Sequence, residues 1–328
     1  MGIETSCDET SVAIVVNGIK ILSNVVASQM NIHEKFGGIV PEIASRKHME
    51  KILPTFQAAL QQSKKELKDI NAIAVVNGPG LKGSLLVGLS FAKAIAYVQK
   101  IPLVAVNHIE GHIYANYLNQ QNIETPFLAL IVSGGHTSLI LVEKMGCFKI
   151  IGQTRDDAAG EVFDKIGKYL DLGYPGGPLI EKRALLGNAT AFHFPRPLKN
   201  AMNFDFSFSG LKTAVIYFLK KQTKNNDPIS IDDICASFQQ AVIDTLLIKT
   251  FSAVREKGVK RLLIGGGVAA NESLRKQFFL KAKEEKVEIH LPPKNLCTDN
   301  AAMIASAGYY KINRGISSTF DIDVYTKR

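Results

Sequence analysis

Two histidines separated by three residues, His108 and His112, are the first candidates for chemistry in this sequence. In a helix, side chains at i and i+4 lie on one face, one turn apart, so both imidazoles can reach one divalent metal ion. A third ligand is needed, and the candidate is Asp299, which lies just before the helical run AAMIASAGYY. Two histidines and one carboxylate would leave positions open for substrate oxygens.

Other interpretations of these residues stay open. The histidines could cap or pack the helix, and an aspartate before a helix commonly caps it. A metalloprotease needs its general-base glutamate immediately after the first histidine, where this chain has Ile109. Glu110 follows Asn107 at the spacing of a capping box, so we expect its side chain to turn back to the helix start.

Three further motifs suit the binding of a charged ligand. The loop SGGHT, at 133–137, follows the apolar run FLALIV, and the segment LLIGGGVAAN, at 262–271, places three glycines before a helix. Glycines let backbone N–H groups approach a phosphate, and a helix N-terminus favours an anion. The loop SGGHT could also be a tight β-turn. The triple-glycine segment lacks the lysine of a P-loop and the spacing of a dinucleotide fingerprint. The third motif, SCDET, presents Asp8 and Glu9 on a polar loop, where surface acids without a role are the alternative.

The pattern of elements predicts an α/β protein. Strands are expected at 72–76 and 103–106, and helices at 84–98 and 109–118. This alternation requires crossover connections and therefore a parallel or mixed sheet.

A weak internal repeat indicates a duplicated domain. The opening segment and the segment from Phe127 both show a strand, a polar loop, a strand, a turn and a strand, about 125 residues apart. The two halves are expected to join at 119–125. An insertion at about 154–230 contains a helix with an apolar stripe, and it also contains three phenylalanines expected on one core-facing side of an extended strand. The stripe is Val162, Phe163, Ile166, Tyr169 and Leu170, and the phenylalanines are Phe204, Phe206 and Phe208.

Composition excludes several classes of protein. The 328 residues are 46% apolar and 21% charged, so a disordered or collagenous chain is excluded. No apolar run approaches the roughly 20 residues of a membrane span, the acidic start is unlike a secretory signal, and the four cysteines form no CxxC pair. We therefore expect a protein of the reducing cytoplasm. The net charge of +9 suits a polyanion such as nucleic acid, although the basic residues are spread along the chain.

Nine blocks, in one order over essentially the whole chain, resemble the TsaD (Gcp) family of bacterial-type tRNA N6-adenosine threonylcarbamoyltransferases. They are GIETSCDETSVAIV, HEKFGGIVPEIASRKHMEKI, NGPGLKGSLLVGLSFAKA, NHIEGH, LIVSGGHT, DDAAGEVFDKIGKYLDLGYPGGP, FSFSGLKTA, IGGGVAANESLR and CTDNAAMIA. The resemblance implies the duplicated actin-like/Hsp70/sugar-kinase (ASKHA) fold, with two domains around a nucleotide cleft. One half would be 1–118 with about 300–328, and the other 126–299 with the substrate-recognition insertion.

The resemblance also implies an activity and partners. Such enzymes transfer the threonylcarbamoyl group from threonylcarbamoyl-AMP to N6 of the adenosine 3′ of the anticodon, in tRNAs that read codons starting with A, and release AMP. Bacterial members work with a TsaB-type paralogue and a TsaE-type ATPase, and neither membrane nor DNA binding is expected. The alternatives are a small-molecule kinase of the same fold, a metalloendopeptidase and a non-catalytic scaffold.

Carried over to matching positions, the resemblance assigns the site residues. The metal ligands would be His108, His112 and Asp299, holding ferrous iron (Fe²⁺) or, with the same ligands, zinc (Zn²⁺). Asp8 and Glu9 would be catalytic. The substrate-binding residues would be Ile131, Val132, Ser133, Gly134, Gly135, Asp164, Gly177 and Asn271. Two departures are notable: fewer residues precede the first glycine than is usual, which indicates a shortened first strand or a start upstream of Met1, and Glu181 stands where some relatives have aspartate.

Overall fold

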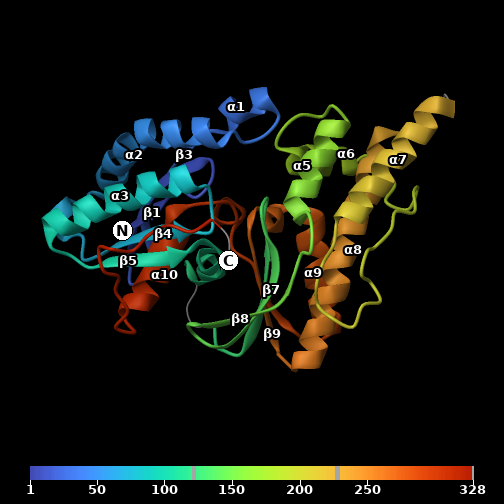
Figure 1. Cartoon of the computed structure of the whole chain (residues 1–328). Helices are drawn as coiled ribbons and strands as arrows, with labels where there is room; N and C mark the ends of the chain where they lie inside the picture. The colour runs from blue at the N-terminus through green and yellow to red at the C-terminus, as the bar shows by residue number, and fades with distance from the viewer. Residues whose placement is uncertain (120–122, 226–229, 327–328) are drawn as a thin grey trace. The chain divides into compact units, whose positions relative to one another are not determined.

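The computed structural model describes residues 1–119, 123–225 and 230–326, and it divides into two compact units (Figure 1). The first comprises Met1–Ile123 together with Pro292–Arg328, and the second comprises Glu124–Leu291. Asp299 therefore belongs to the first unit. None of the helices that the structure describes is long and apolar enough to cross a membrane.

The first unit is built on a five-stranded sheet in the order β3-β2-β1-β4-β5. The first three strands are antiparallel neighbours, whereas β4 and β5 continue the sheet in parallel from β1. The bounds are β1 Gly2–Glu4, β2 Glu9–Val16, β3 Lys20–Ser28, β4 Ile73–Gly78 and β5 Leu103–Asn107. Fully buried residues such as Ile3, Val12 and Val75 form the core on which the helices pack.

Helices cover both faces of this sheet. In Figure 1, α2 and α3 lie on one side, and α10 lies on the other, where it packs against β1, β2, β4 and α4. The bounds are α1 Met30–His33, α2 Pro41–Ser63, α3 Lys82–Gln99, α4 His108–Tyr114 and α10 Ala301–Ile312. The helix expected at 109–118 therefore begins one residue earlier, and its α-helical part ends at Tyr114, after which Ala115–Tyr117 forms a 3-10 turn.

The second unit repeats the topology of the first. Its sheet has the order β10-β9-β6-β7-β8, with β6, β7 and β8 antiparallel and β9 and β10 parallel to β6 and to each other. The bounds are β6 Phe127–Val132, β7 Thr137–Lys144, β8 Cys147–Gln153, β9 Arg261–Gly265 and β10 Glu288–His290. Read from the antiparallel edge, both sheets follow one pattern of connections, which confirms the repeat and the duplicated fold.

The helices of the second unit include the insertion. They are α5 Ala159–Tyr169, α6 Gly176–Ala184, α7 Ser209–Asn225, α8 Ile231–Lys257 and α9 Glu272–Glu284. The predicted stripe is buried at Val162, Phe163 and Ile166, whereas Tyr169 at the end of α5 is exposed. The three phenylalanines are core residues, as expected. The extended strand predicted for them is wrong: the segment forms a single bridge between Phe206 and Thr154.

Candidate functional site

The helix α4 carries both histidines, and its start is fixed by Asn107. This residue ends β5, and its Oδ1 accepts hydrogen bonds from the backbone N–H of Ile109 (2.8 Å) and of Glu110 (3.1 Å). The helix therefore begins directly at His108. Gly111 lets α10 approach, because an added Cβ would lie 2.9 Å from Ile304 Cδ1. The packing of α4 against α10 brings the segment before α10 next to the histidines.

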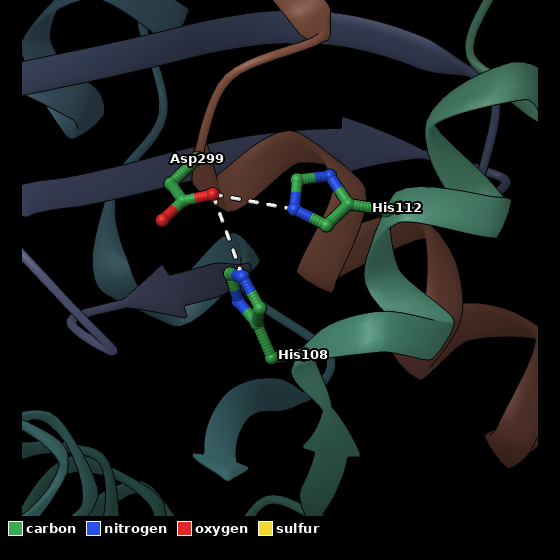
Figure 2. Close-up of side chains that lie close together, drawn as sticks. All are labelled: His108, His112 and Asp299. Carbon is green, nitrogen blue, oxygen red and sulfur yellow. Dashed lines mark ion pairs between the residues drawn. The ribbon is translucent and has the colours of Figure 1, made fainter. Parts of the chain in front are cut away.

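The three predicted metal ligands lie together (Figure 2). His108 Nε2 lies 3.4 Å from Asp299 Oδ1, and His112 Nε2 lies 3.3 Å from the same oxygen. One ligand atom from each residue lies within 4.8 Å of the other two. The nitrogens of both rings thus face one carboxylate oxygen, which is the arrangement expected around a shared cation.

The residues fit a divalent ion. With bonds of about 2.1 Å at a tetrahedral angle, two ligand atoms lie about 3.4 Å apart, close to the separations of Asp299 Oδ1 from the two histidine nitrogens. His112 is fully buried, yet neither of its ring nitrogens makes a hydrogen bond within the described residues. A buried polar atom without a hydrogen bond is costly, and coordination would satisfy it.

Asp299 is not the cap of α10. Asn300 takes that place, and its Oδ1 accepts from the backbone N–H of Met303 at 3.2 Å. The alternative that Asp299 caps the helix is therefore wrong, and its carboxylate is directed at the histidines instead. Its side chain keeps 20% of its surface exposed, whereas the two rings are 6% and 0% exposed. A cation held here would reach solvent on the side of the carboxylate.

The charged groups of the cluster shift one another's pKa. Burial would lower the pKa of His108, but the carboxylates of Asp299 and Glu4 outweigh burial and hold that pKa well above its usual range. Burial would raise the pKa of Asp299, but the nearby His108 and His112 hold it below its usual range. Without a metal the cluster is therefore an ion pair, and a metal ion has to displace the proton of His108.

Two neighbours of the cluster have other roles. Glu110 does not turn back to Asn107: its carboxylate lies 3.0 Å from Lys311 Nζ, so the predicted capping box is wrong. The ammonium group offers a stronger partner than an exposed N–H. The thiol of Cys297 is buried and donates to the backbone oxygens of Pro292 and Pro293. Neither side chain is directed at the metal cluster.

Asp8 ends the loop between β1 and β2, and Glu9 is the first residue of β2. Asp8 is buried, and Glu9 is half-buried. Burial, followed by the negative charges of Asp8 and Asp299, raises the pKa of Glu9 to about 10. In the metal-free protein this raised pKa favours the protonated form of Glu9. His48 holds the loop, with Nε2 3.0 Å from the backbone oxygen of Cys7 and Nδ1 2.8 Å from Thr10 Oγ1.

In the second unit, β6 brings the buried Ile131 and Val132 to the loop Ser133–His136. The Ser133 N–H donates to the backbone oxygen of His136, and its Oγ accepts from the His136 N–H. The loop packs on α5, where an added Cβ on Gly160 would lie 2.6 Å from the Ser133 oxygen. Gly134 and Gly135 are exposed, and their N–H groups make no hydrogen bond within the described residues. These two amides are open to an anion.

The remaining predicted substrate residues of this unit have structural contacts. Asp164 Oδ1 accepts from the Gly176 N–H at 2.8 Å, at the start of α6, and Gly177 is the next residue. Asn271 caps α9 by accepting from the Leu274 N–H, and its Nδ2 donates to Gln239 Oε1 at 2.7 Å. Glu181 accepts from the Glu272 N–H at 2.6 Å. Their contact with a nucleotide stays a prediction.

The duplicated sheets define a protein of the ASKHA class. HypF, in its phosphate- and nucleotide-bound form, superposes with a TM-score of 0.62 at 10% identity over 96% of this chain, which spans about half (48%) of HypF. The activator of 2-hydroxyisocaproyl-CoA dehydratase from Clostridium difficile superposes with a TM-score of 0.53 at 14% identity, over 97% of this chain and 98% of the activator. At these identities the likeness concerns the fold alone.

Sequence similarity identifies the family. The model of the TsaD family, tRNA N6-adenosine threonylcarbamoyltransferase, matches residues 20–306. Proteins of that name from Kosmotoga olearia and Geotalea uraniireducens are 54% and 53% identical, over 98% of this chain and 96% and 94% of theirs. The relative from Caldicellulosiruptor saccharolyticus is 51% identical over 98% of this chain and 95% of its own. The chain belongs to the TsaD family and is a transferase. The kinase, endopeptidase and scaffold alternatives are not favoured.

Proposed function

We propose that this protein transfers the threonylcarbamoyl group from threonylcarbamoyl-AMP to N6 of the adenosine 3′ of the anticodon, in tRNAs that read codons starting with A. The bond between the carbamoyl carbon and the phosphate oxygen breaks, a bond from that carbon to N6 forms, AMP leaves, and N6 loses one proton. The observation that carries the proposal is the group of His108, His112 and Asp299 in a member of this family.

These three side chains would hold the metal in the first unit. A divalent ion bound there would supply a Lewis acid for the carboxylate or carbamoyl oxygens of the donor. The ligands alone do not decide between Fe²⁺ and Zn²⁺, since zinc binds more tightly to most sites of this kind and availability also matters. We propose Fe²⁺ as the native ion, with Zn²⁺ as the alternative.

Positioning should contribute more than base catalysis, because the exocyclic amine of adenine is a poor nucleophile. In the second unit, the open N–H groups of Gly134 and Gly135 suit the phosphate of the donor or a developing oxyanion. We assign contacts with the adenylate to Asp164, Gly177 and Asn271. Near the metal ligands, Asp8 and the protonated Glu9 are the groups suited to bind or transfer a proton.

The proposal includes partners. A TsaB-type paralogue and a TsaE-type ATPase are expected to act with this chain, and the net charge of +9 suits a tRNA substrate. The cytoplasmic location predicted from the sequence accords with a tRNA substrate and stays part of the proposal.

A transfer assay tests the function. The chain, with both bacterial partners, is incubated with threonylcarbamoyl-AMP and unmodified tRNA, with and without a chelator, and the nucleosides are analysed by mass spectrometry. We expect threonylcarbamoyladenosine in the untreated sample and its loss on chelation, with recovery when Fe²⁺ or Zn²⁺ is returned. Absence of product from folded, metal-loaded protein with active partners would refute the proposal.

A further inference from the structure

Glu4, the last residue of β1, lies directly behind one metal ligand. Its side chain is fully buried. One carboxylate oxygen, Oε1, accepts from the backbone N–H of Ser6 at 2.5 Å, and the other, Oε2, lies 3.1 Å from His108 Nδ1. The carboxylate therefore contacts the ring nitrogen opposite the one that faces Asp299.

Glu4 forms one ion pair among the residues that the structure describes. Within the described part of the chain, the ion pair with His108 is the one recorded for this carboxylate, and no lysine or arginine lies against it. A buried carboxylate without a charged partner is costly, so the contact with the imidazole and the hydrogen bond from Ser6 are what stabilise it. The contact with Ser6 is local in the sequence, whereas the contact with His108 joins β1 to the start of α4.

The contact between Glu4 and Nδ1 indicates which nitrogen of the neutral ring carries the proton. An ionised carboxylate only accepts hydrogen bonds, so its contact with Nδ1 requires the proton of the neutral imidazole to be on Nδ1. In the metal-free protein Nε2 also carries a proton, 3.4 Å from Asp299 Oδ1. When a metal ion displaces that proton, the proton on Nδ1 stays and the lone pair is on Nε2. Were Glu4 instead protonated and donating to Nδ1, the ring proton would be on Nε2 and would block coordination.

We propose that Glu4 is a positioning residue for the metal site, which holds His108 in the Nδ1–H tautomer and directs Nε2 at the ion. The inference rests on the metal site of the proposed function, but not on the transfer reaction. Partners of this kind raise the basicity of a histidine ligand and fix the orientation of its ring.

The hydroxyl of Ser6 assists Glu4. Its Oγ lies 3.2 Å from the same Nδ1, and its backbone N–H is the donor to Glu4. His112 differs, because its Nδ1 has no hydrogen bond among the residues that the structure describes. Of the two histidines, His108 is thus the one whose tautomer is determined by protein contacts.

The first test compares the zinc affinity of Glu4→Gln with that of the wild-type chain, by competition with a chromophoric chelator. Loss of an outer carboxylate of this kind weakens metal binding by about 10–100-fold, and we expect a fall in that range. The visible spectrum of bound Co²⁺ should also change, since the ring orientation is no longer fixed.

The matched control is Glu110→Gln, in α4, the helix that carries the two histidine ligands. It makes the same change of charge and shape, but its carboxylate pairs with Lys311 rather than with a ligand. We expect its zinc affinity and Co²⁺ spectrum to equal those of the wild type. A folded Glu4→Gln protein that binds zinc as tightly as the wild type would overturn the inference.

A second measurement uses the unaltered chain and holds even where Glu4→Gln fails to fold. The side-chain nitrogens of ¹⁵N-histidine are observed by NMR in the zinc-loaded protein, with His108 assigned from the spectrum of His108→Gln. We expect His108 to carry its proton on Nδ1 and to bind zinc through Nε2. Binding through Nδ1 would overturn the inference. A chain that shows the expected tautomer but transfers nothing would refute the proposed function and leave this inference standing.

Discussion

At the scale of single residues, His112 is the ligand whose loss should separate metal binding from folding. Its nitrogens make no hydrogen bond among the described residues, so truncation leaves no protein donor or acceptor newly unpaired apart from Asp299. We expect His112→Ala to remain folded, to lose bound metal after dialysis, and to transfer threonylcarbamoyl at least about 100-fold more slowly. Metal content and the transfer assay measure this.

The control for that substitution is His193→Ala, which removes an exposed imidazole in the second unit. Its metal content and transfer rate should match those of the wild type. If His112→Ala is folded and transfers at the normal rate, the metal role of this cluster is disproved.

The ionisation of His108 predicts how metal affinity depends on pH. Its pKa in the metal-free protein lies above the ordinary 6.5, chiefly because the opposite charge of Asp299 outweighs burial. Since the ion displaces one proton, apparent zinc affinity should rise by about tenfold per pH unit from 6.5 up to that raised pKa. Isothermal titration at several pH values measures the slope, and a flat profile would contradict the assignment.

The same pair makes the stability of the metal-free protein depend on pH. The raised pKa of His108 contributes stability that is complete below about 6.5 and is lost as the pH rises through the folded-state value. The depressed pKa of Asp299 contributes stability that is present above about 3.9 and is lost as the pH falls. Urea titrations of chelator-treated protein should therefore show declining stability above pH 6.5, and His108→Gln should remove that decline.

At the scale of elements, the start of α4 is held by its own cap and by the segment near the C-terminus. Asn107 caps the helix through Oδ1, and its Nδ2 donates to the hydroxyl of Tyr325 at 2.7 Å. The N–H of Tyr325 in turn donates to the backbone oxygen of Asn77 at the end of β4. Tyr325 lies beyond residue 306, where the match to the family model ends. The C-terminal segment thus stabilises the start of the metal-binding helix.

The cap at Asn107 can be tested with two substitutions. Asn107→Ala removes both the cap and the bond to Tyr325, and we expect the free energy of unfolding to fall by about 1–2 kcal/mol. Asn107→Ser retains an oxygen that can cap the helix but lacks the amide donor, so its loss should be about half as large. Chemical denaturation of metal-free protein measures both, and equal stabilities for the two variants would show that the cap contributes nothing.

Several elements could be predicted because their signals are local. The strand pairs around the loops at 5–8 and 133–136 can be predicted from apolar runs and turn residues that are adjacent in sequence. The placement of His108 and His112 on one face of a helix can be predicted from their spacing. The role of Glu110 was missed because its partner, Lys311, is about 200 residues away. Glu4 and His48 were missed for the same reason: their partners come from other elements, and no spacing rule connects them.

At the scale of the whole molecule, each unit has its own five-stranded sheet, and the metal ligands belong to the first. They come from α4 and from the segment before α10, which are almost 190 residues apart in the sequence. A metal ion would therefore cross-link two distant parts of one unit. Its effect on stability should be local to that unit.

Hydrogen exchange measured by mass spectrometry, with and without a chelator, tests this expectation. At a free metal concentration about 100 times Kd, binding adds about 2.7 kcal/mol to the stability of the folded state. Hydrogen exchange that requires the metal site to open should then be about 100-fold slower. We expect chelation to accelerate exchange in α4 and in the first turn of α10, while the amides of α8, in the second unit, keep their rates. In His112→Ala the chelator should change nothing. Acceleration in α8 equal to that in α4 would contradict a metal held within the first unit, since His108, His112 and Asp299 all belong to that unit.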